Sequence, residues 1–173
     1  RGAKIPGIFE KAAVHVLPAG RLLGGPLGWL KGLKGIRDGR DMARRMYDNF
    51  RPSVVCGFGG YPALPALLAA IKDDIPTVLH EQNAVLGRVN RLLARKVNAI
   101  ATAYPHVERL KDKFDHKVHL VGNPVREEVL SLRDEEFPAL TDESVFRLLV
   151  TGGSQGASIL SDVVPEGLSM LPI

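Results

Sequence analysis

The chain has a single cysteine, Cys56, and no apolar run long enough to cross a bilayer. A membrane-spanning helix needs roughly 20 consecutive apolar residues, and residues 1–20 hold no signal-peptide core either. Cys56 has no second thiol within the chain to pair with, which is typical of a reducing compartment. Because it lies in an apolar run, we expect it to pack in the core rather than act as a nucleophile.

Zinc-ligand spacings, aromatic RNA-binding motifs and basic recognition helices are also missing, so nucleic acid ranks last among the expected partners. The formal net charge of +4 is unevenly placed. Residues 1–51 hold 11 Lys and Arg against 4 Asp and Glu, whereas residues 52–173 hold 12 against 15. The basic third suits an anionic membrane surface or a charged substrate, and charge alone does not choose between them.

Short apolar runs alternate with helical patterns along the chain. This alternation predicts an α/β fold with a parallel sheet covered by helices on both faces. We expect a loop at residues 21–28, where Gly and Pro cluster. The expected strands are residues 14–17, 53–58, 76–80, 99–103, 117–121 and 145–150, and the expected helical segments are residues 40–50, 64–71, 88–97, 107–113 and 158–171.

A glycine-rich turn at residues 151–157 follows the last expected strand. Such a turn aims several backbone N–H groups and a helix N-terminus at one spot, which suits a diphosphate. One strand, turn and helix cannot bury their own faces, so we expect a second domain to begin here. The predicted division is an N-terminal domain at residues 1–121, a linker at 122–144 and the start of a C-terminal domain at 145–173.

Polar or glycine-rich clusters follow four of the expected strands. In parallel sheets, ligands bind beyond the carboxyl ends of the strands, so clusters at a common edge predict a site. Any one of them alone could be a simple connector. The clusters are Gly57–Pro62, His80–Asn83, Gly122–Arg126 and Thr151–Ala157.

In order and spacing, these clusters resemble the MurG family, GT-B glycosyltransferases of family 28. The matching motifs are Gly59-Gly60-Tyr61, His80-Glu81-Gln82-Asn83, Gly122-Asn123-Pro124-Val125-Arg126 and Gly152-Gly153-Ser154-Gln155-Gly156-Ala157. The resemblance implies an inverting transfer of N-acetylglucosamine from UDP-N-acetylglucosamine to the C4 hydroxyl of undecaprenyl-linked lipid I, giving lipid II. It also implies an incomplete Rossmann-like N-terminal domain, because the family's opening strand and glycine loop have no counterpart here, and such a fragment is expected to be inactive alone.

The resemblance further implies a set of substrate-binding residues. Ser154 matches a serine at the donor diphosphate, Arg126 a donor-site arginine, and Asn83 an asparagine near the sugar and the acceptor. Tyr61 matches an aromatic residue beside the acceptor, and Gln155 is expected to line the same cleft. Structural roles stay open as alternatives: Ser154 as a helix cap, Arg126 in a surface ion pair, and Tyr61 as a turn anchor.

His80 and Glu81 are the candidate catalytic residues, because either could polarise the acceptor hydroxyl. A histidine at a strand end is more often a structural hydrogen-bonder, and we leave the general base unassigned. The chain has no Asp-x-Asp motif, which agrees with a GT-B enzyme that uses a phosphate cradle in place of a metal ion. We therefore expect no metal and no cofactor.

Apolar and basic side chains alternate over residues 27–45 in a pattern that suits a surface helix lying on an anionic bilayer. Glycines at positions 28, 32, 35 and 39 weaken a helix, and the apolar arc, which includes Ile36, could instead pack on the sheet. The resemblance implies a peripheral protein on the cytoplasmic face of the bacterial inner membrane. The predicted membrane patch consists of Trp29, Leu30, Leu33, Lys31 and Lys34.

Two other classes of function stay open. An enzyme similar to UDP-sugar 2-epimerases would need its own catalytic carboxylates at strand ends, and the motif at residues 80–83 argues against it. A non-catalytic module of a cell-wall synthesis assembly would use the sheet edge only for partners. As a transferase, the chain is expected to meet its two substrates, an anionic membrane surface, and other cell-wall synthesis and division proteins.

Overall fold

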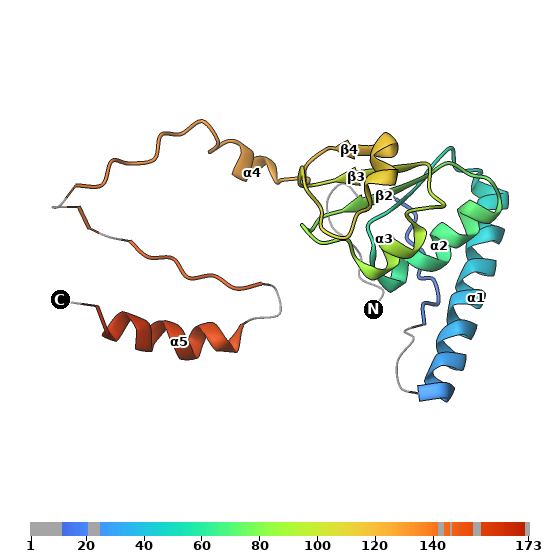
Figure 1. Cartoon of the computed structure of the whole chain (residues 1–173), viewed down its shortest axis with the longest axis horizontal. Coiled ribbons are helices and arrows are strands. Elements are labelled where there is room, and N and C mark those ends of the chain that lie inside the picture. The colour runs from blue at the N-terminus through green and yellow to red at the C-terminus, as the bar shows by residue number, and fades with distance from the viewer. Residues whose placement is uncertain (1–11, 21–24, 142–143, 146, 154–156, 172–173) are drawn as a thin grey trace. The chain divides into compact units, whose positions relative to one another are not determined.

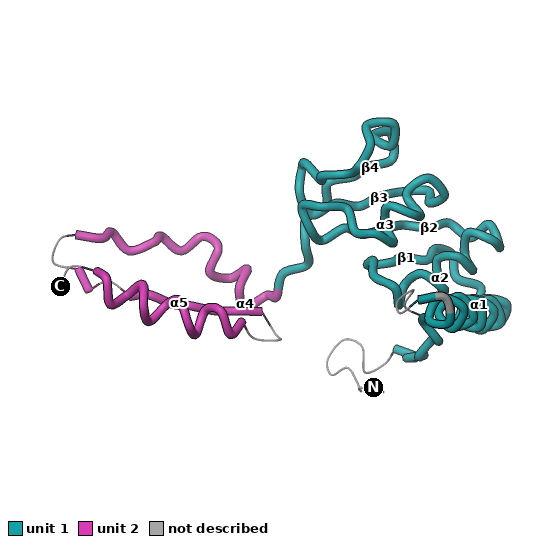
Figure 2. The backbone as a smooth tube through the Cα atoms, turned by 60° about the horizontal axis from the view of Figure 1, so that its bottom comes forward, with its two compact units in different colours: residues 1–125 teal, residues 126–173 magenta. Residues whose placement is uncertain are grey.

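The computed structural model describes residues 12–20, 25–141, 144–145, 147–153 and 157–171. It divides into two compact units, Arg1–Val125 and Arg126–Ile173 (Figure 2). The elements are α1 (Gly25–Phe50), β1 (Val55–Gly57), α2 (Gly60–Lys72), β2 (Thr77–Glu81), α3 (Arg88–Leu93), β3 (Ala99–Thr102), the 3-10 helix η2 (Asp112–Lys117), β4 (Val118–Leu120), α4 (Glu127–Leu130) and α5 (Ser158–Ser169).

The first unit is built on a four-stranded parallel sheet whose strands follow one another in sequence order, β1-β2-β3-β4. Figure 2 labels all of these strands, and Figure 1 labels β2, β3 and β4. This parallel sheet confirms the predicted α/β fold. In the described residues, α2 and α3 pack on the same face of these strands, as expected when successive right-handed crossovers move in one direction, and α1 packs on α2. The prediction that helices cover both faces stays a prediction.

The hydrophobic core lies between these helices and the two central strands. Leu79 of β2 and Ile100 of β3 are fully buried against Leu67 of α2 and Leu93 of α3. Gly57 of β1 leaves room for Leu67, because a Cβ at that position would overlap the leucine side chain. The core therefore fixes the strands from one side and leaves their carboxyl ends at a common edge.

Helix α1 begins earlier than the sequence predicts. The expected loop at residues 21–28 is wrong from Gly25 onward, where the 26-residue helix starts. Its glycines serve close packing: a Cβ at Gly39 would overlap the Pro18 carbonyl oxygen. Arg44 of α1 forms an ion pair with Asp73, the residue that follows α2. Arg44 Nη2 and Nε each lie 2.8 Å from Asp73 Oδ1, and Nε lies 2.9 Å from Oδ2.

Two predicted strands do not form in the described part of the chain, at residues 14–17 and 145–150. Leu149 is 86% exposed, and its neighbours are exposed as well. A strand is stable only when a neighbouring strand accepts its backbone hydrogen bonds, and neither segment has such a neighbour here. The helix predicted at residues 158–171 is confirmed as α5.

Cys56 is a further correction, because it is exposed rather than part of the core. Successive side chains of a strand point to opposite faces. Since Gly57 faces Leu67 of α2, Cys56 faces the other side. There it lines a hollow together with Met46 and Phe50 of α1. The helical turns expected at residues 107–113 are likewise displaced, to the 3-10 helix at residues 112–117.

None of the helices in the described ranges combines the length and the apolar character needed to span a membrane.

Candidate functional site

The candidate site lies where β2 ends and its loop leads into α3. Glu81, the last residue of β2, is only 2% exposed. Its Oε1 accepts hydrogen bonds from the backbone N–H and the side-chain Nδ2 of Asn83, at 3.2 and 3.0 Å. Its Oε2 accepts from the Gly87 N–H and from Asn90 Nδ2, both at 2.8 Å. The carboxylate thus holds together the whole loop from strand to helix.

These donors decide the charge of the carboxylate. Burial by itself raises the pKa of the Glu81 carboxyl, but hydrogen bonds from Gly87, Asn90 and Asn83 outweigh it and hold the pKa below its usual range. A hydrogen bond to the charged form favours that form. Glu81 is therefore an anion at neutral pH, and its acceptor positions are taken.

Asn83 is exposed at the start of this loop, with its amide nitrogen fixed by Glu81. The amide keeps one N–H and its carbonyl oxygen for a ligand, which suits a sugar hydroxyl. Tyr61 lies in the first turn of α2 and is half-buried against the hydrophobic core. The predicted roles of both residues stay predictions.

His80 is buried one residue before Glu81, and both of its ring nitrogens have partners. Nε2 lies 3.0 Å from the Gly122 carbonyl oxygen, and Nδ1 lies 3.0 Å from the Gln82 amide nitrogen. The His80 ring also stands 5.3 Å from the ring of Phe58, which follows β1. The clusters predicted after β1, β2 and β4 are thus brought together at one edge of the sheet.

Sequence reasoning missed Asn90, a polar residue on the buried side of α3. It is 2% exposed, and its Nδ2 donates to Glu81 and to the His80 carbonyl oxygen. Its Oδ1 is the one buried side-chain polar atom of the described residues without a hydrogen-bond partner. The available signal was a polar side chain among the apolar positions of the expected helix at residues 88–97.

The predicted donor-side residues lie in the second unit. Arg126 is exposed and directly precedes α4, and its carbonyl oxygen accepts hydrogen bonds from the N–H groups of Val129 and Leu130. Among the described residues, no ion pair joins it to a glutamate. Ser154 and Gln155 lie outside the described residues. Their roles, like that of Arg126, stay predictions.

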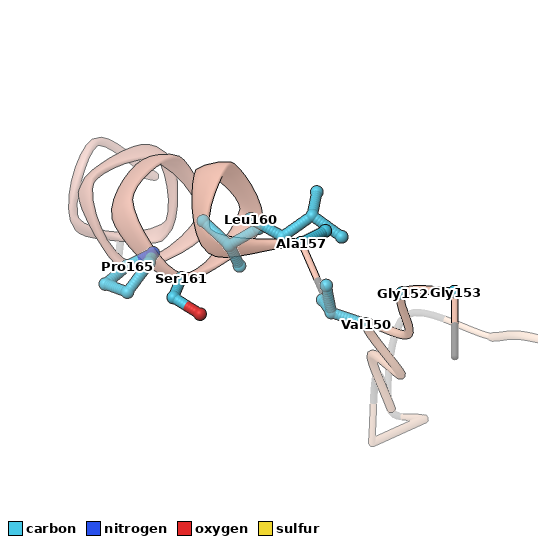
Figure 3. A pocket seen from close by; sticks show the side chains of 8 residues that line it. Val150, Gly152, Gly153, Ala157, Leu160, Ser161 and Pro165 are labelled. Carbon is cyan, nitrogen blue, oxygen red and sulfur yellow. The ribbon is translucent and has the colours of Figure 1, made fainter. Parts of the chain in front are cut away.

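A hollow of about 380 Å³ lies where the glycine-rich segment meets the first turns of α5. Figure 3 shows the glycines on one side of it and side chains of the helix on the other. It is in the place that the sequence predicts for a diphosphate, although the strand expected before it is not formed. Its lining residues are Val150, Gly152, Gly153, Ala157, Leu160, Ser161, Val164 and Pro165.

The predicted membrane patch lies on the amino-terminal half of α1. Its apolar members are exposed: Leu30 by 66%, Trp29 by 55% and Leu33 by 52%. Lys31 and Lys34 are exposed as well. The alternative, in which the apolar arc packs on the sheet, applies only to Ile36, which is half-buried against the core.

The described residues contain no cluster of three or more His, Cys, Asp or Glu placed to hold a metal ion.

Relatives of this chain are found along nearly its whole length. Residues 10–102 match the glycosyltransferase family 28 N-terminal domain. A protein of Erythrobacter litoralis is 62% identical over 99% of this chain and 43% of its own length. One of Novosphingobium aromaticivorans is 66% identical over 99% of this chain and 44% of its own length. Both are named UDP-N-acetylglucosamine–N-acetylmuramyl-(pentapeptide) pyrophosphoryl-undecaprenol N-acetylglucosamine transferase.

A solved structure agrees with these relatives. The crystal structure of Acinetobacter baumannii MurG matches with a TM-score of 0.61 and 30% identity, over 82% of this chain and 38% of that one. This chain thus spans less than half the length of these relatives. The match supports a Rossmann-like N-terminal domain of the GT-B type and confirms the resemblance that the motifs indicate. The chain therefore belongs to glycosyltransferase family 28, the family of the MurG transferases.

Proposed function

We propose that this chain forms part of an inverting glycosyltransferase that moves N-acetylglucosamine from UDP-N-acetylglucosamine to the C4 hydroxyl of lipid I, forming lipid II. The relatives named for this transfer match 99% of the chain. A place in peptidoglycan synthesis, and through it in cell shape and division, follows from this reaction. Contacts with other cell-wall synthesis and division proteins belong to the same proposal.

The observation that carries the proposal is the Glu81 network at the carboxyl edge of the sheet. It holds Asn83, an exposed amide, in one orientation beside the loop that starts α3. An amide held in this way can bind a sugar hydroxyl without losing side-chain freedom at the moment of reaction. Since all acceptor positions of Glu81 are taken, we infer that Glu81 acts through Asn83 and does not take up the proton itself.

The remaining predicted residues divide between the two substrates. Tyr61 lies on the acceptor side, while Arg126, Ser154 and Gln155 belong to the donor side. As the glycosidic bond to the donor breaks, negative charge grows on the departing diphosphate. A guanidinium and backbone N–H groups at the start of α5 are suited to stabilise that charge.

We further propose that the membrane patch on α1 holds the enzyme on the cytoplasmic face of the bacterial inner membrane. A lipid-linked acceptor presents its sugar at a membrane surface, so the enzyme must work there. Exposed Trp29, Leu30 and Leu33 can enter the head-group region, while Lys31 and Lys34 meet anionic lipid. The support for this proposal is the exposure of these three apolar side chains on α1 and the positive charge of the two exposed lysines.

A chimera tests the proposed reaction. This chain replaces the aligned stretch of the Erythrobacter litoralis relative, and transfer of radiolabel from UDP-N-acetylglucosamine to a short-chain lipid I analogue is measured. We expect activity in the chimera, and we expect Asn83→Ala to lower kcat/KM about a hundredfold because the positioned amide is lost.

Asn49→Ala is the matched control, because Asn49 is an exposed asparagine on α1 away from the sheet edge. It should leave kcat/KM unchanged. An inactive chimera, or an Asn83→Ala variant as active as the parent, would contradict the proposal. Conversion of UDP-N-acetylglucosamine without any acceptor would favour the epimerase class instead.

A further inference from the structure

We propose that His80 and Gln82 are positioning residues that clamp the chain segment Val121–Asn123 across the carboxyl edge of the sheet. The inference rests on the proposed function, because the clamp sets where the chain leaves the acceptor-side unit. It also gives His80 a role other than acid–base catalysis.

The path of the chain after β4 is the first observation. Strand β4 pairs with β3, and β3 separates it from β2. After β4, the N–H groups of Val121 and Gly122 both donate to the Thr102 carbonyl oxygen at the end of β3. Gly122 then accepts a hydrogen bond from His80 of β2. The segment therefore runs from β4 past the end of β3 to the end of β2, where the candidate site begins.

Gly122 makes this reversal possible. Its φ of +77° lies in the left-handed region, which other residue types adopt only at a cost. No heavy atom lies within 4 Å of the position that a Cβ would take. Backbone conformation rather than lack of space is thus the reason for glycine at the point where the chain turns.

The hydrogen-bond partners of His80 determine which of its ring nitrogens donates and which accepts. The Gly122 carbonyl can only accept, so His80 Nε2 must carry the hydrogen. Gln82 Nε2 lies 3.0 Å from His80 Nδ1 and 3.2 Å from the His80 carbonyl oxygen. The Gln82 amide nitrogen donates to the His80 carbonyl oxygen and to Nδ1, so Nδ1 must accept its hydrogen bond with a lone pair. Nε2 therefore donates and Nδ1 accepts, so both ring nitrogens of His80 are occupied by partners within the chain.

Asn123 completes the clamp. Its Nδ2 donates to the Gln82 carbonyl oxygen at 3.3 Å. The segment is therefore held by His80 at Gly122 and by Gln82 at Asn123. The chain passes from there through Pro124 and Val125 to Arg126, where the second unit begins. The same motif thus fixes Asn83 through Glu81 and fixes the exit of the chain through His80 and Gln82. If the segment Val121–Asn123 were held less firmly, the acceptor loop would keep its structure, but the point at which the chain leaves the first unit would no longer be fixed.

Two substitutions separate clamping from catalysis. In His80→Gln, the amide nitrogen replaces Nε2 and can still donate to Gly122, whereas in His80→Asn the amide is one bond shorter and cannot reach. In the chimera, we expect His80→Gln to keep kcat/KM within about threefold of the parent and His80→Asn to lower it about tenfold to a hundredfold. If His80 were the general base, both would lose activity alike, by about 100-fold to 10,000-fold.

Hydrogen exchange in the 173-residue chain gives a readout that does not depend on turnover. We expect faster exchange at Val121 and Gly122 in His80→Asn and near-parental exchange in His80→Gln. Asn123→Ala, at an exposed position that should not affect folding, should also speed exchange at Gly122.

Unchanged exchange in both His80→Asn and Asn123→Ala would overturn the clamp, as would His80→Gln losing as much activity as His80→Asn. An inactive parent chimera would refute the proposed reaction, while the exchange experiment would still decide the clamp.

Discussion

At the scale of single residues, Glu81 shows how one buried charge can organise a loop. Removing a carboxylate from water is costly unless hydrogen bonds replace its hydration, and here four donors from three residues do so. Asn90 Nδ2 also donates to the His80 carbonyl oxygen, whereas the donors of Asn83 and Gly87 are held in the loop by the carboxylate. Loss of the charge should therefore affect stability and site geometry together.

The first residue-scale prediction concerns pH. Because the folded-state pKa of Glu81 is below its ordinary value of 4.5, its contribution to stability is fully present above about pH 4.5 and is lost as pH falls through the lower, folded-state pKa. Glu81→Gln should lower the free energy of unfolding by about 2 to 3 kcal/mol at pH 7. The difference from the parent should shrink in acid.

Urea unfolding of the chain between pH 7 and pH 3 measures this difference. Glu128→Gln, on the exposed α4, is the control and should change stability by less than about 0.5 kcal/mol. A Glu81→Gln deficit that stays constant over the whole pH range would show that packing, rather than charge, makes the contribution.

At the scale of elements, α1 presents two different faces. Its glycine face packs closely, as the contact between Gly39 and Pro18 requires, and its apolar arc at the amino-terminal end is exposed. The sequence could not choose between a packed and an exposed arc, because the same spacing serves both. The neighbours decide: the segment at residues 18–20 and α2 occupy the inner face and leave Trp29 outside.

The element-scale prediction concerns membrane binding by this arc. Replacing Trp29, Lys31 and Lys34 together by alanine should weaken co-sedimentation with anionic liposomes about tenfold or more, since each lysine near such a surface contributes about 1 kcal/mol. The parent chain should bind neutral liposomes less tightly than it binds anionic liposomes. The matched control replaces the exposed residues Leu92, Lys96 and Lys111, which lie outside α1. Equal binding by the two triple variants would refute the membrane role.

At the scale of the whole molecule, the second unit contrasts with the first. Unit 1 has a buried core shared by strands and helices, whereas Leu148, Leu149 and Val150 of unit 2 are exposed. The relatives are more than twice as long as this chain. An apolar segment of this kind, followed by a glycine turn and a helix, gains stability only when further strands and helices cover it.

Hydrogen exchange tests this contrast. In the 173-residue chain, amides at residues 147–150 should exchange at nearly unprotected rates, while those at residues 78–81 and 99–102 stay protected by strand pairing and burial. In the chimera, where the remainder of the relative can supply neighbours, residues 147–150 should gain protection by about a hundredfold or more. Equal exchange of this segment in both proteins would refute a strand at this position.

The sequence by itself determined the parallel α/β architecture and the gathering of His80, Asn83 and Gly122 at one edge. Both follow from local patterns, since apolar strand runs alternate with helices and parallel strands end on the same side. Only the tertiary structure decided which face the helices cover, because that depends on strand order. It alone also decided the tautomer of His80, whose hydrogen-bond partner Gly122 lies 42 residues away. Local patterns carry no information about such distant partners, and those partners determine what each polar side chain of the site can do.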